Sequence, residues 1–162
     1  MTVNVKELYE EISADEGKVL HAYLCSELHP TVGIGHKILD TDPDKNLEIY
    51  GINWEKVPKD QHITEHRCYV LFQEDVQKAI SGCMNIYDSW EELPKELQHI
   101  LINMAFQLGQ RGLSRFKNMK AAVEDQNWTL AAVEMMDSRW AEHQTPERAL
   151  RLSKRVAALE PK

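Results

Sequence analysis

The stretch that decides the fold covers residues 16–36 and reads EGKVLHAYLCSELHPTVGIGH. Gly17 follows a segment with helical periodicity and is well placed to end that helix in a left-handed cap. Further along, Pro30, Gly33 and Gly35 punctuate the chain, and apolar residues alternate with other residues. This alternation is typical of short strands joined by tight turns, so we predict a small β region here.

The sequence on both sides of this stretch is mainly helical. Apolar residues recur at helical spacing over residues 1–12. Residues 39–60 are polar with little sign of regular structure, and a long helix over residues 64–82 follows, with Thr64 suited to cap it. The longest apolar stripe comes next and closes at Gly109, which marks the best candidate for a buried central helix.

These patterns predict an α+β fold that is mainly helical, built as a single domain over residues 1–162. A small N-terminal lobe over about residues 13–63 would carry the strands, and a connecting helix over about residues 64–82 would follow. The C-terminal lobe would be helical and would comprise about residues 83–162 together with the helix over residues 1–12. Predicted helix N-caps in this lobe are Asn127 and Thr145.

Composition excludes several classes of protein. The chain carries 19 Lys and Arg against 26 Asp and Glu, a net charge of −7, and it has no basic block, which argues against a nucleic-acid partner. No apolar run approaches the roughly 20 residues that span a bilayer, and no targeting segment is visible, so we expect a chain folded in a cytoplasm without stable membrane association. The three cysteines lack a paired-loop pattern and do not indicate a disulfide framework.

Glu16 is the first candidate for catalysis, because a carboxylate at a junction between helix and strands can face a cleft. An alternative is structural, since Ser13 and Glu16 have the spacing of a capping box, in which the Glu side chain bonds back to a backbone N–H. Gly17 weakens this alternative because it ends the helix directly after Glu16.

One cysteine and three histidines fall within sixteen residues and have the side chains that bind zinc. A helix would place His21, Cys25 and His29 on one face, but Pro30 disfavours a helix through this region. A zinc-dependent amidase or peptidase that uses this cluster, which also contains His36, is therefore the weakest of our interpretations.

The spacing of the opening stretch resembles the active-site segment of phage-type lysozymes of the T-even kind, glycoside hydrolase family 24. That family has Glu, eight residues, Asp or sometimes Cys, five residues, Thr, and a Gly-Ile-Gly-His hairpin, and Glu16, Cys25 and Thr31 match it. Residues 101–109 (LINMAFQLG) and residues 138–149 (SRWAEHQTPERA) resemble two further motifs of the family. Because the three blocks match in order, the resemblance implies a two-lobed lysozyme-like fold with no metal or organic cofactor.

The resemblance implies a role for each matched residue. Glu16 would be the general acid and has to carry a proton near neutral pH, while Thr31 would orient the attacking water. Cys25 stands where better-known members have Asp. A free thiol is mostly neutral at pH 7, and an ionised Glu16 would raise its pKa further. We therefore expect Cys25 to be a weak polar group that positions water, with inversion at the anomeric carbon. A thiolate nucleophile and a small buried residue without a catalytic role are the alternatives.

Substrate contacts are implied in the same way. Arg148 matches an Arg that pairs with the catalytic Glu and favours its ionised form, so substrate binding would have to disrupt the pair. Phe106 and Arg139 match family positions that line the saccharide cleft. The alternative roles are core packing for Phe106 and a surface ion pair for Arg139. The other family positions around the saccharide are matched by Glu27, Gln107 and Gln144.

His36 is expected to be structural, because the family pairs this His with an Asp on the long helix, and Asp75 matches that position. The pair predicts a raised pKa for His36. Its stabilisation would be present at low pH and would be lost as the pH rises through the raised value.

The resemblance implies an endolysin, a monomeric muramidase that hydrolyses β-1,4 bonds between N-acetylmuramic acid and N-acetylglucosamine in peptidoglycan to release phage progeny. It would wait in the host cytoplasm and act on the wall in the periplasm once a holin opened the inner membrane. A non-catalytic glycan-binding or scaffold module with the same fold is the alternative. Cys25 and the charge of −7, unexpected for an enzyme that acts on carboxylate-rich peptidoglycan, leave this alternative open.

Overall fold

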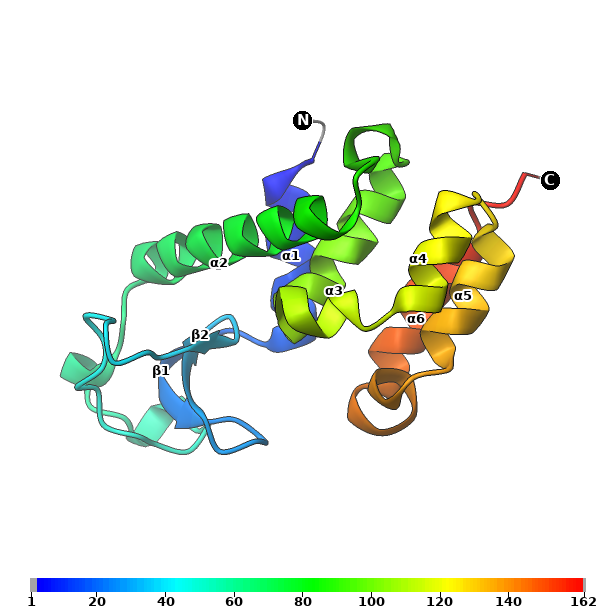
Figure 1. The fold of residues 1–162 in the computed structure, drawn as a ribbon. Helices are drawn as coiled ribbons and strands as arrows, with labels where there is room; N and C mark the ends of the chain where they lie inside the picture. Colours follow the sequence, from blue (N-terminus) through cyan, green and yellow to red (C-terminus); the bar gives the residue numbers. More distant parts are fainter. Residues whose placement is uncertain (1–2, 162) are drawn as a thin grey trace. The chain divides into compact units, whose positions relative to one another are not determined.

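The computed structural model describes residues 3–161 and confirms the predicted α+β class, mainly helical with one small sheet (Figure 1). The chain divides into two compact units, residues 4–77 and residues 78–162, the second of which also includes the first residues of the chain. The division lies inside the long helix. The predicted lobe boundaries, and the predicted placement of the first helix with the C-terminal lobe, stay predictions.

Helix α1, Val5–Glu16, opens the first unit. The Asn4 side chain caps it by accepting a hydrogen bond from the backbone N–H of Glu7, and the predicted residues 1 and 2 of this helix lie outside the described residues. Gly17 ends the helix as predicted, with a positive φ of 79°. Its ψ of 152° makes the cap extended, so the expected left-handed helical conformation was wrong.

The sheet has three antiparallel strands in the order β1-β2-β3. They are β1, Val19–Leu24, β2, Pro30–Gly33, and β3, His36–Lys37. Gly33 and Gly35 have φ values of 71° and 63°, a region that side chains other than glycine rarely adopt, and they form the turn between β2 and β3. The β region predicted from the alternation of apolar residues is therefore present.

Residues 39–60 form the polar segment that the sequence predicts, with little regular structure. Its 3-10 turn η1 covers Trp54–Lys56, and a second turn, η2, covers Lys59–Gln61. The segment and the residues that follow it run alongside the sheet, because the backbone N–H groups of Tyr50 and Ile63 donate hydrogen bonds to carbonyls of β1.

Helix α2, Glu65–Ile86, begins where predicted, and the Thr64 hydroxyl accepts a hydrogen bond from the N–H of Arg67. It continues four residues past Gly82, the predicted end. The reason is that Gly82 serves packing rather than termination, since a Cβ at this position would lie 3.0 Å from the Cβ of Gln110.

The second unit is helical, and in it α5 packs against both α4 and α6 (Figure 1). The central helix α3 is almost fully buried along its first half, and Gly109 breaks its helical conformation with φ 74° and ψ 169°, as the sequence predicts. No helix within residues 3–161 is long and apolar enough to cross a bilayer. The elements are η3 (Trp90–Glu92), α3 (Lys95–Ser114), α4 (Lys117–Glu124), α5 (Trp128–Met136), the π-helical turn η4 (Trp140–Gln144) and α6 (Pro146–Ala157).

The predicted N-caps of this unit have different outcomes. Asn127 caps α5 by accepting a hydrogen bond from the N–H of Leu130, which confirms the prediction. Thr145 stands at the N-cap position of α6, but its side chain makes no capping hydrogen bond. Its hydroxyl accepts a hydrogen bond from the side chain of Gln107 instead.

Candidate active site

Glu16 is the last residue of α1 and is half-buried. The capping-box alternative was wrong because Ser13 lies inside the helix, where its hydroxyl donates to the carbonyl of Tyr9. The carboxyl group instead lies against the glycine turn of the sheet. A Cβ on Gly35 would be 3.0 Å from Oε2 of Glu16, so the turn approaches the carboxylate closely only because residue 35 has no side chain.

Cys25 and Thr31 are held together by the turn that joins β1 to β2. The backbone N–H of His29 donates to the sulfur of Cys25 at 3.4 Å. The buried hydroxyl of Thr31 donates to the carbonyl of His29 at 2.8 Å. Since that hydroxyl has its proton on a carbonyl, its oxygen keeps lone pairs that can accept a hydrogen bond from a water molecule.

The electrostatics of Cys25 differ from the expectation. Burial raises the pKa of its thiol, but the backbone N–H groups of His29 and Glu27 and the charge of Lys37 lower it, and the net shift is downward. The expectation of a raised thiol pKa was therefore wrong. The sequence could not show that the turn aims hydrogen-bond donors at the sulfur. A thiol with a lowered pKa has a larger thiolate fraction at a given pH than the weak polar group that we expected, and the thiolate is the form that can accept a proton.

Tyr23 is a residue of this site that the sequence analysis missed. It is buried and stands opposite Thr31 in the register of β1 and β2. Burial raises the pKa of its phenol, and the negative charges of Glu16 and Cys25 raise it further, which places Tyr23 near both groups. A signal was present, because Tyr23 precedes Cys25 by two residues and such residues share a face in an extended chain.

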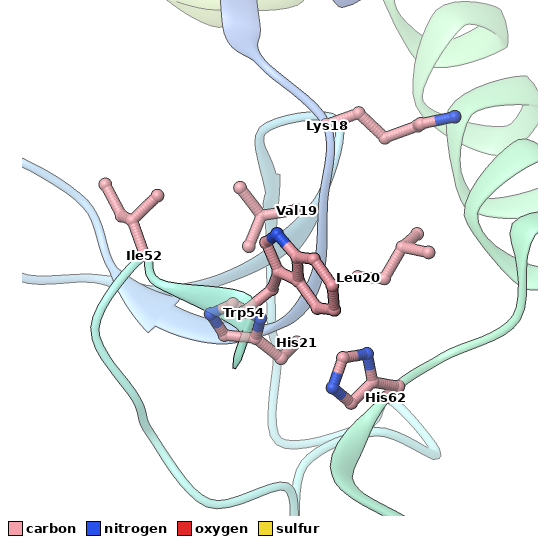
Figure 2. A pocket seen from close by; sticks show the side chains of 7 residues that line it. All are labelled: Lys18, Val19, Leu20, His21, Ile52, Trp54 and His62. Atoms are coloured by element: carbon pink, nitrogen blue, oxygen red, sulfur yellow. The ribbon is translucent and has the colours of Figure 1, made fainter. Parts of the chain in front are cut away.

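The Cys and His cluster does not form the helical face considered for zinc, because residues 19–24 are a strand. His21 directs Nε2 at the carbonyl of Gly51, 2.6 Å away, and its ring lies near His62 (Figure 2). The sulfur of Cys25 accepts the backbone N–H of His29, and His36 pairs with Asp75. Within residues 3–161, no group of three His, Cys, Asp or Glu side chains is arranged to hold a metal ion.

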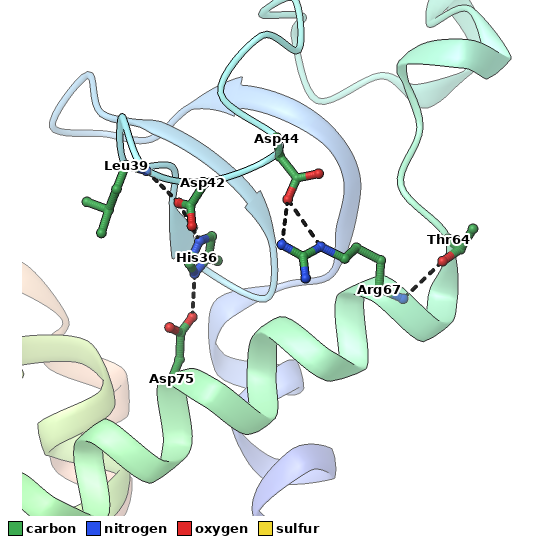
Figure 3. Close-up of polar contacts among 7 residues, drawn as sticks. All are labelled: His36, Leu39, Asp42, Asp44, Thr64, Arg67 and Asp75. Carbon is green, nitrogen blue, oxygen red and sulfur yellow. Dashed lines mark hydrogen bonds and ion pairs between the residues drawn. The ribbon is translucent and has the colours of Figure 1, made fainter.

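His36 pairs with Asp75 as predicted, with 2.7 Å between Nδ1 and a carboxylate oxygen (Figure 3). The sequence analysis missed Asp42, whose carboxylate lies 3.1 Å from Nε2 of His36 and accepts the N–H of Leu39. Burial lowers the pKa of His36, but both carboxylates raise it, and the net shift is the predicted increase. The pKa of Asp42 is lowered, because its hydrogen bonds and the imidazole charge outweigh its burial.

Figure 3 shows a second tie between the polar segment and α2. Arg67 donates from Nε and Nη2 to one carboxylate oxygen of Asp44, at 3.2 and 3.1 Å. Together with the His36 pair, this contact anchors residues 39–60 to the helix without regular secondary structure.

In the second unit, the amide of Gln107 is fixed at both ends. Its oxygen accepts the indole N–H of Trp140 at 2.9 Å, and its nitrogen donates to Thr145 at 3.2 Å. Arg148 is buried, and its Nε donates to the side-chain oxygen of Asn103 at 2.8 Å. Its predicted pairing with Glu16 stays a prediction. Asn103 was not singled out from the sequence, although it stands in the LINMAFQLG block.

The remaining predicted substrate residues are accessible. Arg139 and Gln144 are exposed at the two ends of η4, where Arg139 lines a shallow pocket with residues of that turn. Phe106 is half-buried on α3 rather than part of the closed core, and Glu27 is exposed.

Comparison with known proteins decides the family. Residues 13–158 match the family model described as phage lysozyme. The chain belongs to the phage lysozyme family. Probable T4-type lysozymes 1 and 2 of Dictyostelium discoideum are each 30% identical to it over 158 residues, 91% of this chain and 92% of theirs. The pre-baseplate central spike protein Gp5 of Enterobacteria phage T4 is 30% identical over 152 residues, 89% of this chain and 26% of the spike protein.

This member of the phage lysozyme family is therefore a lysozyme-like glycoside hydrolase. Its unit of residues 4–77 brings together Glu16, Tyr23, Cys25 and Thr31 around the sheet. The catalytic and substrate-binding roles of these and the other site residues stay predictions.

Proposed function

We propose that this member of the phage lysozyme family is a muramidase that hydrolyses the β-1,4 bond between N-acetylmuramic acid and N-acetylglucosamine in peptidoglycan. The observation that carries the proposal is the position of Glu16, a carboxyl group at a helix end, seated on the turn at Gly35. The Cys25 and Thr31 pair in the same unit supplies the groups that handle water. Membership of the family supports the substrate class.

The chemistry needs one acid and one water-directing group. The carboxylic acid of Glu16 gives its proton to the glycosidic oxygen while the bond from that oxygen to the anomeric carbon breaks. A water molecule attacks the anomeric carbon from the opposite face, held by the oxygen of Thr31. The water proton passes to the thiolate of Cys25, whose fraction the lowered pKa increases, and the product has the inverted configuration.

Substrate contacts form a second part of the proposal. Arg139, Gln144 and Glu27 are exposed, as residues that touch a polymer have to be. The anchored amide of Gln107 is preorganised by Trp140 and Thr145, so a saccharide would meet it in a fixed orientation. The proposal also assigns contacts with the saccharide or its carboxyl groups to Phe106 and Arg148.

The biological setting is also a proposal. The enzyme acts as a monomeric endolysin that is held in the host cytoplasm and reaches the wall in the periplasm after a holin permeabilises the inner membrane. The similarity to a central spike protein favours a second setting, in which such a lysozyme acts at the start of infection as part of a tail structure. Both settings use the same hydrolysis.

The Glu16→Gln variant tests the proposal, because an amide cannot donate the proton. We expect clearing of permeabilised Gram-negative cells to slow by about 100-fold or more. Glu10→Gln on the exposed face of α1 is the matched control and should clear cells at the normal rate. Mass spectrometry of the released fragments should show new N-acetylmuramic acid reducing ends.

Three results would contradict the proposal. Normal activity of Glu16→Gln would show that another group is the general acid. A wild-type protein that binds cell walls without cutting them would support the non-catalytic module. Release of stem peptides, blocked by chelators, would support the zinc-dependent amidase or peptidase.

A further inference from the structure

A second pocket lies in the unit of residues 4–77, and none of the catalytic candidates lines it (Figure 2). Its volume is about 370 Å³, near the lower end of the sizes of small-molecule sites. Its walls come from the first residues of β1, from Ile52 and Trp54, and from His62. A pocket of this size suits one ring of a polymer rather than a long segment of it.

The rim of this pocket carries exposed apolar surface. The side chain of Trp54 is 67% exposed and that of Ile52 is 68% exposed. The other tryptophans, Trp90, Trp128 and Trp140, are all buried. Asn53 holds the Trp54 turn by accepting the N–H of Glu55, so the indole is presented from an ordered 3-10 turn. A flat aromatic surface at a pocket rim matches the apolar C–H face of a pyranose ring.

The charges around the pocket favour an uncharged ligand. Lys18 is the cationic residue among the lining side chains, and its ammonium group pairs with Glu65 at 2.7 Å. The pKa of Lys18 is raised, first by this hydrogen bond, which favours its charged form. Because Glu65 neutralises Lys18, a carboxylate ligand would gain little here compared with a neutral one.

His21 adds a hydrogen-bond acceptor to the pocket wall. Its Nε2 faces the carbonyl of Gly51, so Nε2 carries the proton and Nδ1 of the neutral ring carries the lone pair. Nδ1 is buried and has no hydrogen-bond partner within the described residues. Because the atom is buried, the ring has to turn before a donor in the pocket that it lines can satisfy it. A sugar hydroxyl is such a donor.

We propose that this pocket is a second saccharide site, which binds one neutral N-acetylhexosamine ring of a glycan strand by stacking on Trp54. The choice of ligand rests on the proposed muramidase function, because peptidoglycan then supplies such rings in large number. A site outside the catalytic residues holds the enzyme on the insoluble wall between cleavage events and lowers its dissociation rate.

Fluorescence quenching tests the pocket directly, since Trp54 is the exposed tryptophan of the four. Acrylamide should quench Trp54 in the Glu16→Gln protein, and N-acetylglucosamine trimers should protect it. The protected signal should vanish in Glu16→Gln with Trp54→Phe. Quenching that the trimer leaves unchanged, in a protein that still binds sacculi, would overturn the proposal. Protection by an apolar peptide but not by the trimer would overturn the sugar assignment and indicate a protein-docking surface.

A pelleting assay with purified sacculi tests the role. In the Glu16→Gln background, Trp54→Ala should weaken binding to sacculi by about tenfold. Leu39→Ala, which removes another exposed apolar side chain of the same unit outside the pocket, should leave it unchanged. Equal binding with and without the Trp54→Ala substitution would refute the saccharide site at Trp54 and leave the proposed muramidase function untouched. Absence of sacculus binding by every variant would count against the muramidase function itself, and circular dichroism confirms that each variant is folded.

Discussion

Gly35 shows how a single residue without a side chain positions a reactive group. Its φ of 63° suits glycine, and a Cβ would stand 3.0 Å from a carboxylate oxygen of Glu16. Gly33 has a similar φ of 71°, so a side chain there would be strained in the same way, but its Cβ would contact Cys68 at 3.4 Å. The two glycines therefore separate the effect of backbone strain from the effect of displacing the carboxyl group.

Replacing Gly35 by Ala should destabilise the protein by about 1 to 2 kcal/mol and should also reduce activity about tenfold or more, because Glu16 has to move. Gly33→Ala should cause a similar loss of stability and leave the specific activity of the folded protein much less affected. Thermal unfolding and cell-clearing rates measure the two effects. Equal activity losses in both variants would show that the contact with Glu16 has no catalytic importance.

Cys25 is the residue whose chemistry departs most from the expectation. Its lowered pKa increases the thiolate fraction at a given pH, and activity should rise as the pH increases through that pKa. Cys25→Ser lacks a group that ionises in this range and should lose about 100-fold in rate. Cys25→Asp should recover the activity that Cys25→Ser loses. The acidic limb of its pH profile should lie at lower pH than that of the wild type. A serine variant with the wild-type rate and pH profile would remove the thiol from the mechanism.

At the scale of elements, the polar segment 39–60 is held by side chains rather than by a ladder of strands. His36 joins Asp75 on α2 to Asp42 in the segment. The raised pKa of His36 gives stabilisation that is complete below its unfolded value, about 6.5, and lost as the pH rises through the folded value. The lowered pKa of Asp42 gives stabilisation present above about pH 3.9 and lost as the pH falls through its folded value.

The Asp75→Asn substitution should therefore destabilise the protein by about 2 kcal/mol near pH 5.5, and by less at higher pH, as His36 loses its proton. The pKa of His36 should fall. Denaturant unfolding across this range and NMR titration of the imidazole measure both effects. Glu74→Gln, the exposed neighbour on α2, is the control. If Asp75→Asn lowers the free energy of unfolding by the same amount at every pH, the assigned pair of His36 and Asp75 is contradicted.

Elements also show where sequence patterns succeed and fail. Gly109 interrupts a helix as predicted, because its backbone takes a positive φ, and a Cβ there would meet nothing within 4 Å. Gly82 was predicted to do the same, yet it lies inside α2 against Gln110. The two glycines look alike in sequence, since the feature that separates them is a contact with a residue distant along the chain. Asp42 was missed although it lies only six residues from His36.

At the scale of the whole molecule, the order of three sequence blocks predicts the family and the class of fold. The catalytic candidates lie in the unit of residues 4–77, and most of the proposed substrate contacts lie in the unit of residues 78–162. The direction of the Cys25 pKa was beyond prediction, because it depends on backbone N–H groups that only the folded turn brings together. The net charge of −7 should weaken long-range attraction to the acidic wall, which gives a separate wall-binding site such as that at Trp54 a clear advantage.

The most direct test of the central claim is proton NMR of the anomeric products from a defined peptidoglycan oligomer, recorded during the first turnover. The wild-type enzyme should release the α-anomer of the new reducing end before mutarotation, and Glu16→Gln should release almost none. A β-anomer as the first product, or undiminished product from Glu16→Gln, would contradict hydrolysis by Glu16 with water directed at the opposite face.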